Sequence, residues 1–218
     1  MFPAIVALAR FTSVLAAVLW LAGLPYVSLA GAIPSDAEYF AWGGLGVLVG
    51  AATLPLASIY PGSFTGRWVR PVRAAGVMIC VGLVVTGVLL VSGATGGLGS
   101  RAPGWVSPAG DIAVIAFFAW VVVAGNSARR SPTLGRAPFW LGLLGGGAFL
   151  LQILVAAVEV NIFPNATSTD WTALLLLVPF ALYWLCIPAW FVVLASRMRG
   201  REAVAVLLDT GPSSPNTS

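Results

Sequence analysis

The sequence predicts an all-α protein, a polytopic transmembrane bundle of six spans. Hydrophobic residues make up 59% of the 218-residue chain and charged residues only 8%, a composition outside the range of soluble domains. Six apolar runs are close to or longer than the roughly 20 residues that a helix needs to cross a hydrocarbon core. Hydrophobicity does not alternate along them, which argues against a transmembrane barrel.

The predicted spans leave only short loops between them. We place them at residues 11–30, 40–60, 74–93, 108–125, 137–158 and 171–196. Residues 1–201 therefore form one membrane domain. Residues 202–218 end in a run of serine, proline, threonine and asparagine and are predicted to be a disordered cytoplasmic tail.

The first three spans follow from length and helix signals. The first apolar run has about 19 residues, more than the 7–15 of a signal-peptide core, so we expect it to be retained. Ser35 and Glu38 have capping-box spacing, which predicts that the second helix begins at about Asp36. Gly46 and Gly50 in this helix predict a close helix–helix contact. The third span is uniformly apolar.

The last three spans carry further markers. The fourth is the shortest and must include residues 108–111 to cross, which places the Asp111 carboxylate near the outer surface. In the fifth, Gly142 and Gly146 repeat the close-packing spacing. Pro179 and Pro188 predict a kink or tilt in the sixth.

The arginines predict the orientation. All eleven basic residues are arginine, and ten fall on one side of the predicted bundle, mostly in loops. Short loops rich in arginine stay in the cytoplasm, so both termini should be cytoplasmic. That side should contact anionic lipid headgroups and no nucleic acid, because its charge is discontinuous. The ten are Arg10, Arg67, Arg70, Arg73, Arg129, Arg130, Arg136, Arg197, Arg199 and Arg201.

The other side carries Arg101 and five acids. If the acids converge, they could attract a cationic ligand; alternatively, several of them simply begin helices. They are Asp36, Glu38, Asp111, Glu159 and Asp170.

The missing residue types exclude much chemistry. Without histidine there is no imidazole base or metal ligand, and without lysine there is no Schiff base. Cys80 and Cys186 are isolated within predicted spans rather than paired in a CxxC motif. We therefore predict no metal and no cofactor, and we favour a protein that is not an enzyme.

Polar residues in the fifth span form one candidate site. Gln152 and Glu159 are seven residues apart, so they share a helix face about 10 Å apart. An ionisable residue within a membrane span is a functional candidate. The alternative is that Gln152 joins two helices and Glu159 extends to water.

Aromatic residues form another candidate site. Trp20, Trp120 and Trp184 lie near the middle of their spans, whereas interfacial belts explain Trp42, Trp105, Trp171, Trp68 and Trp140. With Phe117, Phe118 and Tyr183, the central tryptophans could line a pocket for a lipophilic molecule. Alternatively, they fill gaps between glycine-rich helices.

Two segments resemble a known group. The stretch GNSARRSPTLGRAPFWLGLLG (125–145) and the stretch LVPFALYWL (177–185) are similar to small six-span bacterial membrane proteins of the DUF4386-like kind. The resemblance implies a six-helix integral membrane protein of unassigned function. The lysine-free composition, rich in alanine, valine, glycine and arginine, is typical of a high-GC bacterium and indicates its inner membrane.

Two classes of function follow. The first is a membrane protein without covalent chemistry: an accessory or regulatory subunit, or a binder or permease of a lipophilic or cationic small molecule. The alternative is an enzyme acting on an isoprenoid or lipid, like a membrane terpene cyclase, with Glu159 as general acid. The Trp-Glu pair associated with such cyclases is absent, because Gly43 follows Trp42.

The orientation can be tested with reporter fusions. A reporter active only in the periplasm should work when fused after Pro164 and fail when fused after Arg199, because the two sites lie on opposite sides. The reverse result would invert the predicted topology.

Overall fold

Six α-helices make up nearly all of the described chain. The computed structural model describes residues 2–30, 35–59, 69–95, 104–129, 134–162 and 170–198, and these contain no strand. Each helix is long and apolar enough to cross a membrane, which confirms the all-α class and the six predicted runs. The helices are α1 (Phe2–Ala30), α2 (Ser35–Ile59), α3 (Val69–Ala94), α4 (Val106–Ala128), α5 (Ala137–Ile162) and α6 (Asp170–Arg197).

Several helices extend beyond their predicted spans. The start of α2 at Ser35 is one residue from the position that the capping spacing predicts, and α4 includes Asp111 as expected. In contrast, α1 begins at Phe2, nine residues before the predicted span. Proline at position 3 does not prevent this, because the first turn of a helix makes no use of its backbone N–H. The sixth helix continues through Pro179 and Pro188.

The expectation that the arginines lie in loops is wrong for four of them. Arg10, Arg70, Arg73 and Arg197 are helical. Arginine favours helix, and its long aliphatic stem carries the charge towards water from within an apolar helix. Arg10 Nε instead donates a hydrogen bond to the Ala195 carbonyl, at 3.2 Å. Arg129 and Arg136 lie just outside α4 and α5, as predicted. The remaining basic-side residues, Arg67, Arg130, Arg199 and Arg201, lie outside the described residues, as do Arg101 and the tail.

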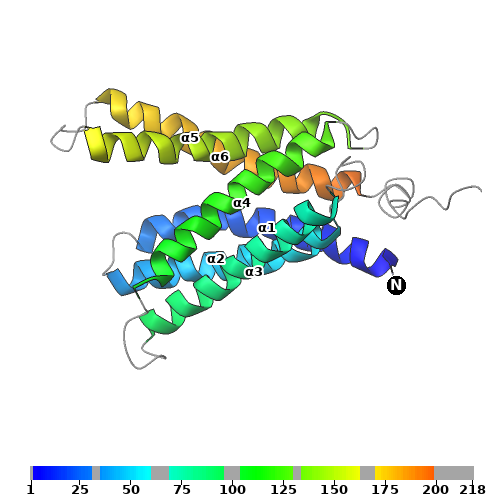
Figure 1. Cartoon of the computed structure of the whole chain (residues 1–218), viewed down its shortest axis with the longest axis horizontal. Coiled ribbons are helices and arrows are strands. Elements are labelled where there is room, and N and C mark those ends of the chain that lie inside the picture. Colours follow the sequence, from blue (N-terminus) through cyan, green and yellow to red (C-terminus); the bar gives the residue numbers. More distant parts are fainter. Residues whose placement is uncertain are drawn as a thin grey trace, which may run out of the picture.

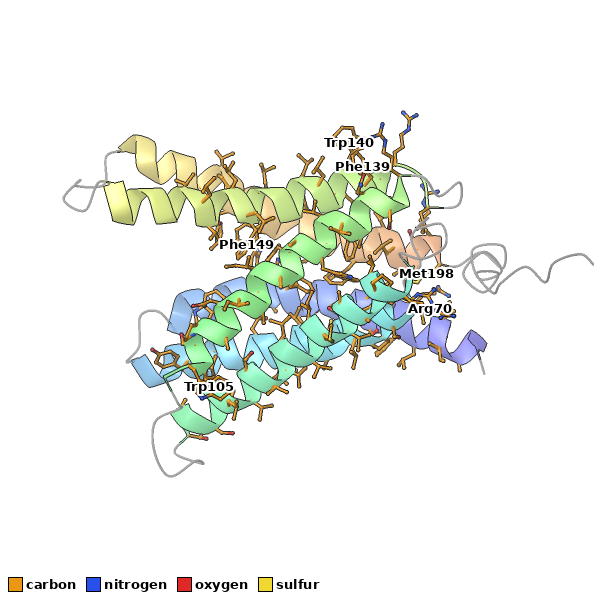
Figure 2. The ribbon with its side chains drawn as sticks, in the orientation of Figure 1. Arg70, Trp105, Phe139, Trp140, Phe149 and Met198 are labelled. Atoms are coloured by element: carbon orange, nitrogen blue, oxygen red, sulfur yellow. The ribbon has the colours of Figure 1, made fainter. Side chains whose placement is uncertain are left out.

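The helices form a closed ring in chain order. Each packs against the helices before and after it, and α6 packs against α1. Figure 1 shows α5 and α6 along one side of the bundle, α1, α2 and α3 along the other, and α4 crossing between them. The described arginines gather at one end of the ring, called the arginine end below, near Met198 and Arg70 in Figure 2.

Glycines bring α2 and α3 into backbone contact. A Cβ atom built on Gly43 would lie 2.7 Å from the Gly87 carbonyl oxygen, and one on Gly50 would lie 2.9 Å from that of Cys80. A backbone carbonyl oxygen in a helix cannot move aside to relieve such an overlap, whereas the end of a flexible side chain can. Small residues in membrane helices permit such close approach, so the packing predicted from Gly46 and Gly50 is confirmed, with α3 as the partner.

Glycines also bring α4 and α5 into backbone contact. A Cβ on Gly142 would lie 3.0 Å from the Val121 carbonyl oxygen, and one on Gly146 would lie 2.8 Å from that of Phe118. The neighbouring Gly145 faces α6 instead, where a Cβ would lie 2.9 Å from Ile187. The contact predicted from Gly142 and Gly146 is therefore also confirmed.

The outer surface of the ring is apolar. Phe11 is 68% exposed and Met78 67% exposed, values that suit hydrocarbon surroundings and not water. Trp42, Trp105 and Trp140 are each at least half exposed near helix ends, as expected of interfacial tryptophans. The side chains of Trp68 and Trp171 lie outside the described residues.

The glycine contacts predict an unusual response to alanine. Within a helix, Gly→Ala normally stabilises by about 1 kcal/mol. We expect Gly43→Ala to lower the free energy of unfolding by about 1–3 kcal/mol instead, because the added methyl overlaps the Gly87 carbonyl. Denaturant unfolding in detergent measures this.

Gly147→Ala is the matched control, since nothing lies within 4 Å of its added methyl. This variant should be at least as stable as the parent. Equal stability of both variants would show that α2 and α3 are not held at this distance.

Candidate functional site

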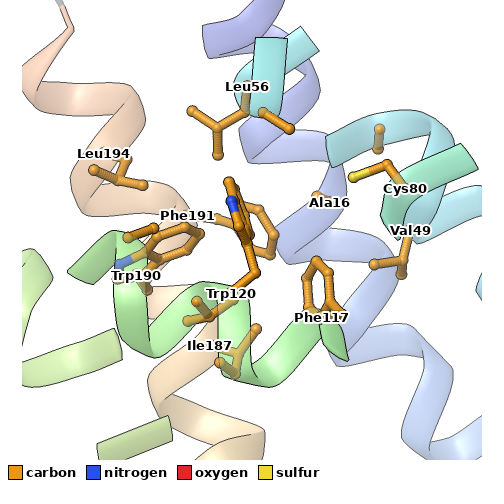
Figure 3. Close-up of a cluster of buried hydrophobic side chains, with 14 of the residues drawn as sticks. Ala16, Val49, Leu56, Cys80, Phe117, Trp120, Ile187, Trp190, Phe191 and Leu194 are labelled. Carbon is orange, nitrogen blue, oxygen red and sulfur yellow. The ribbon is translucent and has the colours of Figure 1, made fainter. Parts of the chain in front are cut away.

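The interior aromatic side chains form two groups, which are linked by an edge-to-face contact between Phe117 and Phe118 with ring centroids 5.6 Å apart. The first group contains Trp120. In Figure 3, Trp120 lies with Phe117, Trp190 and Phe191 among aliphatic side chains. The ring centroids of Trp120 and Trp190 are 6.1 Å apart in an edge-to-face arrangement, a favourable geometry for aromatic pairs. All four side chains are buried.

Trp120 is anchored to α3 by its indole N–H. The Nε1 atom donates to the Val72 carbonyl at 3.2 Å. A Cβ on Gly76 would lie 2.6 Å from this nitrogen, so glycine is needed for the indole to lie against α3. This arrangement supports the interpretation of Trp120 as a gap-filling residue, because its indole joins α4 to α3.

The second group, called the aromatic cage below, contains the other predicted aromatic residues. Trp20 on α1 lies 5.6 Å from Trp184 and 6.4 Å from Tyr183 on α6, and 5.6 Å from Phe118 on α4, between ring centroids. Three elements far apart in sequence thus meet at mid-depth. The cage comprises Trp20, Phe118, Phe149, Phe180, Tyr183 and Trp184.

Phe149 and Phe180 complete the cage. Phe149 points from α5 towards α4 (Figure 2) and stacks on Phe118, with centroids 3.7 Å apart. Phe180 stacks on Trp184 at 6.0 Å and lies edge-on to Tyr183 at 5.3 Å. Neither residue was predicted from the sequence to belong to this site. The available signal was helical spacing, since Phe180 precedes Tyr183 by three residues and Trp184 by four.

Two buried polar atoms at the cage have no hydrogen-bond partner within the described chain. One is Trp20 Nε1, on a residue that is only 9% exposed, and the other is the Gln152 side-chain oxygen. Gln152 lies one turn beyond Phe149 on the same face of α5, away from the arginine end. Leaving a buried donor or acceptor unpaired costs about 1–3 kcal/mol. The pair offers one N–H and one carbonyl group to a guest molecule.

Of the five predicted acids, the structure describes the side chain of Asp111 alone. Glu159 lies on α5 two turns beyond Gln152, on the face that the spacing predicts, and its side chain is outside the described residues. Asp111 is exposed in the second turn of α4. Asp36 and Glu38 lie at the start of α2 and Asp170 begins α6, with side chains likewise undescribed.

The two cysteines also lie in helices. Cys80 on α3 is buried and Cys186 on α6 is half-buried, and both are free thiols. The Cys80 side chain is buried in the apolar core, which agrees with the packing role expected of an isolated apolar thiol.

The fold and these sites define a class, a bundle of helices long and apolar enough to span a membrane, with an aromatic interior. Comparison with known proteins adds no family: no protein-family model, no curated protein and no solved structure matches this chain.

The different environments of two tryptophans can be tested. Trp120→Phe removes the hydrogen bond to the Val72 carbonyl and should lower the free energy of unfolding by about 1 kcal/mol beyond the loss of ring area. Trp20→Phe loses a similar ring area and no hydrogen bond within the described chain. Denaturant unfolding of the two variants in detergent, after removal of bound lipophilic compounds, gives the comparison.

Trp120→Phe should therefore be the less stable variant. Equal losses would mean that the Trp120 hydrogen bond contributes nothing net, and a larger loss for Trp20→Phe would show that its N–H is paired in the protein.

Proposed function

We propose that the six helices span the inner membrane of a bacterium with the arginine end in the cytoplasm. Two observations support this orientation. The described arginines lie at one end of the ring, and the outer surface between the ends is apolar. Asp111 lies towards the other end, on the described first half of α4. Membership of the DUF4386-like group and contact with anionic headgroups at the arginine end belong to the same proposal.

Within this arrangement, the protein binds a lipophilic molecule that carries one polar group, and the cage is the binding site. The observation that carries the proposal is that the Trp20 N–H and the Gln152 amide oxygen are both buried without a hydrogen-bond partner within the described chain. Hydrocarbon offers no water to either atom. A hydroxyl group suits both, because it accepts a hydrogen bond from the indole and donates one to Gln152.

The cage supports recognition without covalent chemistry. Its six aromatic rings and Gln152 provide apolar faces, a donor and an acceptor, the composition of small-molecule sites that orient a ligand. Trp120 is not part of this site, since its N–H already bonds to Val72. Transport of the ligand or regulation of a partner subunit would build on the same binding step.

A second candidate function is an enzyme that protonates an isoprenoid or lipid in the cage. One observation favours it: α5 is continuous from Gln152 to Glu159, so an acid lies about 10 Å beyond the amide on the same face. Aromatic faces would stabilise a cationic intermediate, and Glu159 would be the general acid.

Binding at the cage predicts a co-purifying compound. Mass spectrometry of the organic extract of detergent-purified protein should show a lipophilic compound with a hydroxyl or carbonyl group, near one per protein. Trp20→Phe and Gln152→Leu should each reduce its occupancy about tenfold, because each removes a hydrogen bond that is buried in an apolar site.

Trp140→Phe is the control, because Trp140 is exposed at the arginine end, away from the cage. It should retain the compound. Undiminished compound in Trp20→Phe and Gln152→Leu would exclude the cage as its site, and a stoichiometric protein partner without any compound would favour an accessory subunit.

Glu159→Gln separates binder from enzyme. A binder should keep the same compound unchanged in this variant. Accumulation of a different, uncyclised or unprotonated compound in its place would favour the acid-initiated enzyme.

A further inference from the structure

A second apolar site lies on the outside of the ring. Between α1, α2 and α3 the surface is hollowed by a groove of about 710 Å³, within the range of about 300–1,000 Å³ of sites that hold small molecules. None of the cage residues lines it. Its walls include Leu19 and Gly23 from α1, Phe40, Gly44 and Leu48 from α2, and Val88 from α3.

The groove opens outward, away from the cage. Leu48 and Val88 on its rim are about half exposed, and Phe40 is 42% exposed. The lining is almost wholly apolar, with Ser92 as its single polar side chain. Because the three helices are candidate membrane spans, the opening faces the hydrocarbon of the bilayer in the proposed arrangement.

Gly44 leaves space in the groove that helix packing does not require. The adjacent Gly43 contacts the α3 backbone, but a Cβ on Gly44 would meet nothing within 4 Å. A side chain at Gly44 would project into the hollow. Glycine at this position therefore keeps the groove deep, at the usual cost of glycine within a helix.

The position of the groove selects one leaflet. The nine residues from Phe40 to Leu48 span about 12 Å of helix, less than half of a hydrocarbon core about 30 Å thick. Ser92 lies two residues from the end of α3, away from the arginine end. The groove thus runs from the boundary of the bilayer towards its middle, with its hydroxyl group near the boundary.

We propose that this groove holds one acyl chain of a membrane phospholipid from the leaflet opposite the arginine end. The apolar walls receive the chain, and the Ser92 hydroxyl lies at the depth of the ester groups. The inference is independent of the cage, since the two sites share no residue.

Photo-crosslinking tests the proposal directly. Full-length protein is reconstituted into vesicles of phosphatidylethanolamine and phosphatidylglycerol that contain a phosphatidylglycerol with a diazirine on one acyl chain. After illumination, labelled peptides are mapped by mass spectrometry. Labelling should concentrate on the peptides that cover 40–48 and 88–92, whereas labelling spread evenly over all exposed helix faces would overturn the proposal.

Gly44→Leu should block the site. The leucine side chain fills the hollow and removes van der Waals contacts between the groove walls and the acyl chain, so labelling of these peptides should fall severalfold. Gly147→Leu is the matched control, because its position on α5 is equally open and lies outside the groove. Equal labelling in the two variants would overturn the proposal.

Two further outcomes are decisive. If Gly44→Leu does not fold, Gly44→Ala adds one methyl to the same open position and should give a smaller but measurable loss of labelling. If native mass spectrometry shows a dimer that Gly44→Leu converts to monomer, a second copy of the chain fills the groove and the lipid is excluded. Trp20→Phe should leave this labelling unchanged, because Trp20 does not line the groove. The groove proposal can therefore be tested independently of ligand binding at the cage.

Discussion

Backbone contact at glycines sets how closely the helices of this bundle approach. Lipid gives apolar side chains no reason to prefer one another over acyl chains, so van der Waals contact between well-fitted surfaces must hold membrane helices together. Here Gly43 and Gly87 join α2 to α3, and Gly142 and Gly125 join α4 to α5. The two glycine-packed pairs are the rigid parts on which the other helices depend.

The remaining helices pack by a different means. Where α1 and α6 meet α4 and α5, large aromatic rings make much of the contact, and Gly145 brings α5 against Ile187 of α6. The Trp20 N–H lies among these rings, and neither it nor the Gln152 amide oxygen has a hydrogen-bond partner within the described chain. The division between glycine-packed and aromatic-packed interfaces thus decides where a guest could be held, and it leaves the groove over Gly44 on the outside.

Much of this fold follows from local patterns. Apolar length predicts all six helices, Ser35 and Glu38 predict the start of α2 to within one residue, and glycine spacing predicts two interfaces. The partner of each glycine was beyond prediction, because small-residue spacing says that a close approach occurs and not with which helix. Arg10 was misplaced for a similar reason: its carbonyl acceptor, Ala195, is remote in sequence.

The candidate site was predicted in part. Trp20 and Trp184 were selected for their depth in the spans and Tyr183 as an aromatic residue that could join them, and the three do meet. Trp120 has the same depth and yet faces α3, because the direction in which a helix turns a residue depends on tertiary packing. Phe149 lacked any polar marker that would separate it from ordinary apolar residues, and its stacking on Phe118 is visible only in the folded ring.

The closure of the ring between α1 and α6 has a consequence for biosynthesis. Chains are made from the N-terminus, so α1 is synthesised long before α6 exists. Until then, the face of α1 that carries Trp20 lacks its aromatic neighbours on α6, and Arg10 lacks the Ala195 carbonyl. A nascent chain released before α6 would therefore expose the aromatic face of α1 to other proteins. That face becomes covered only when the last helix packs against the first.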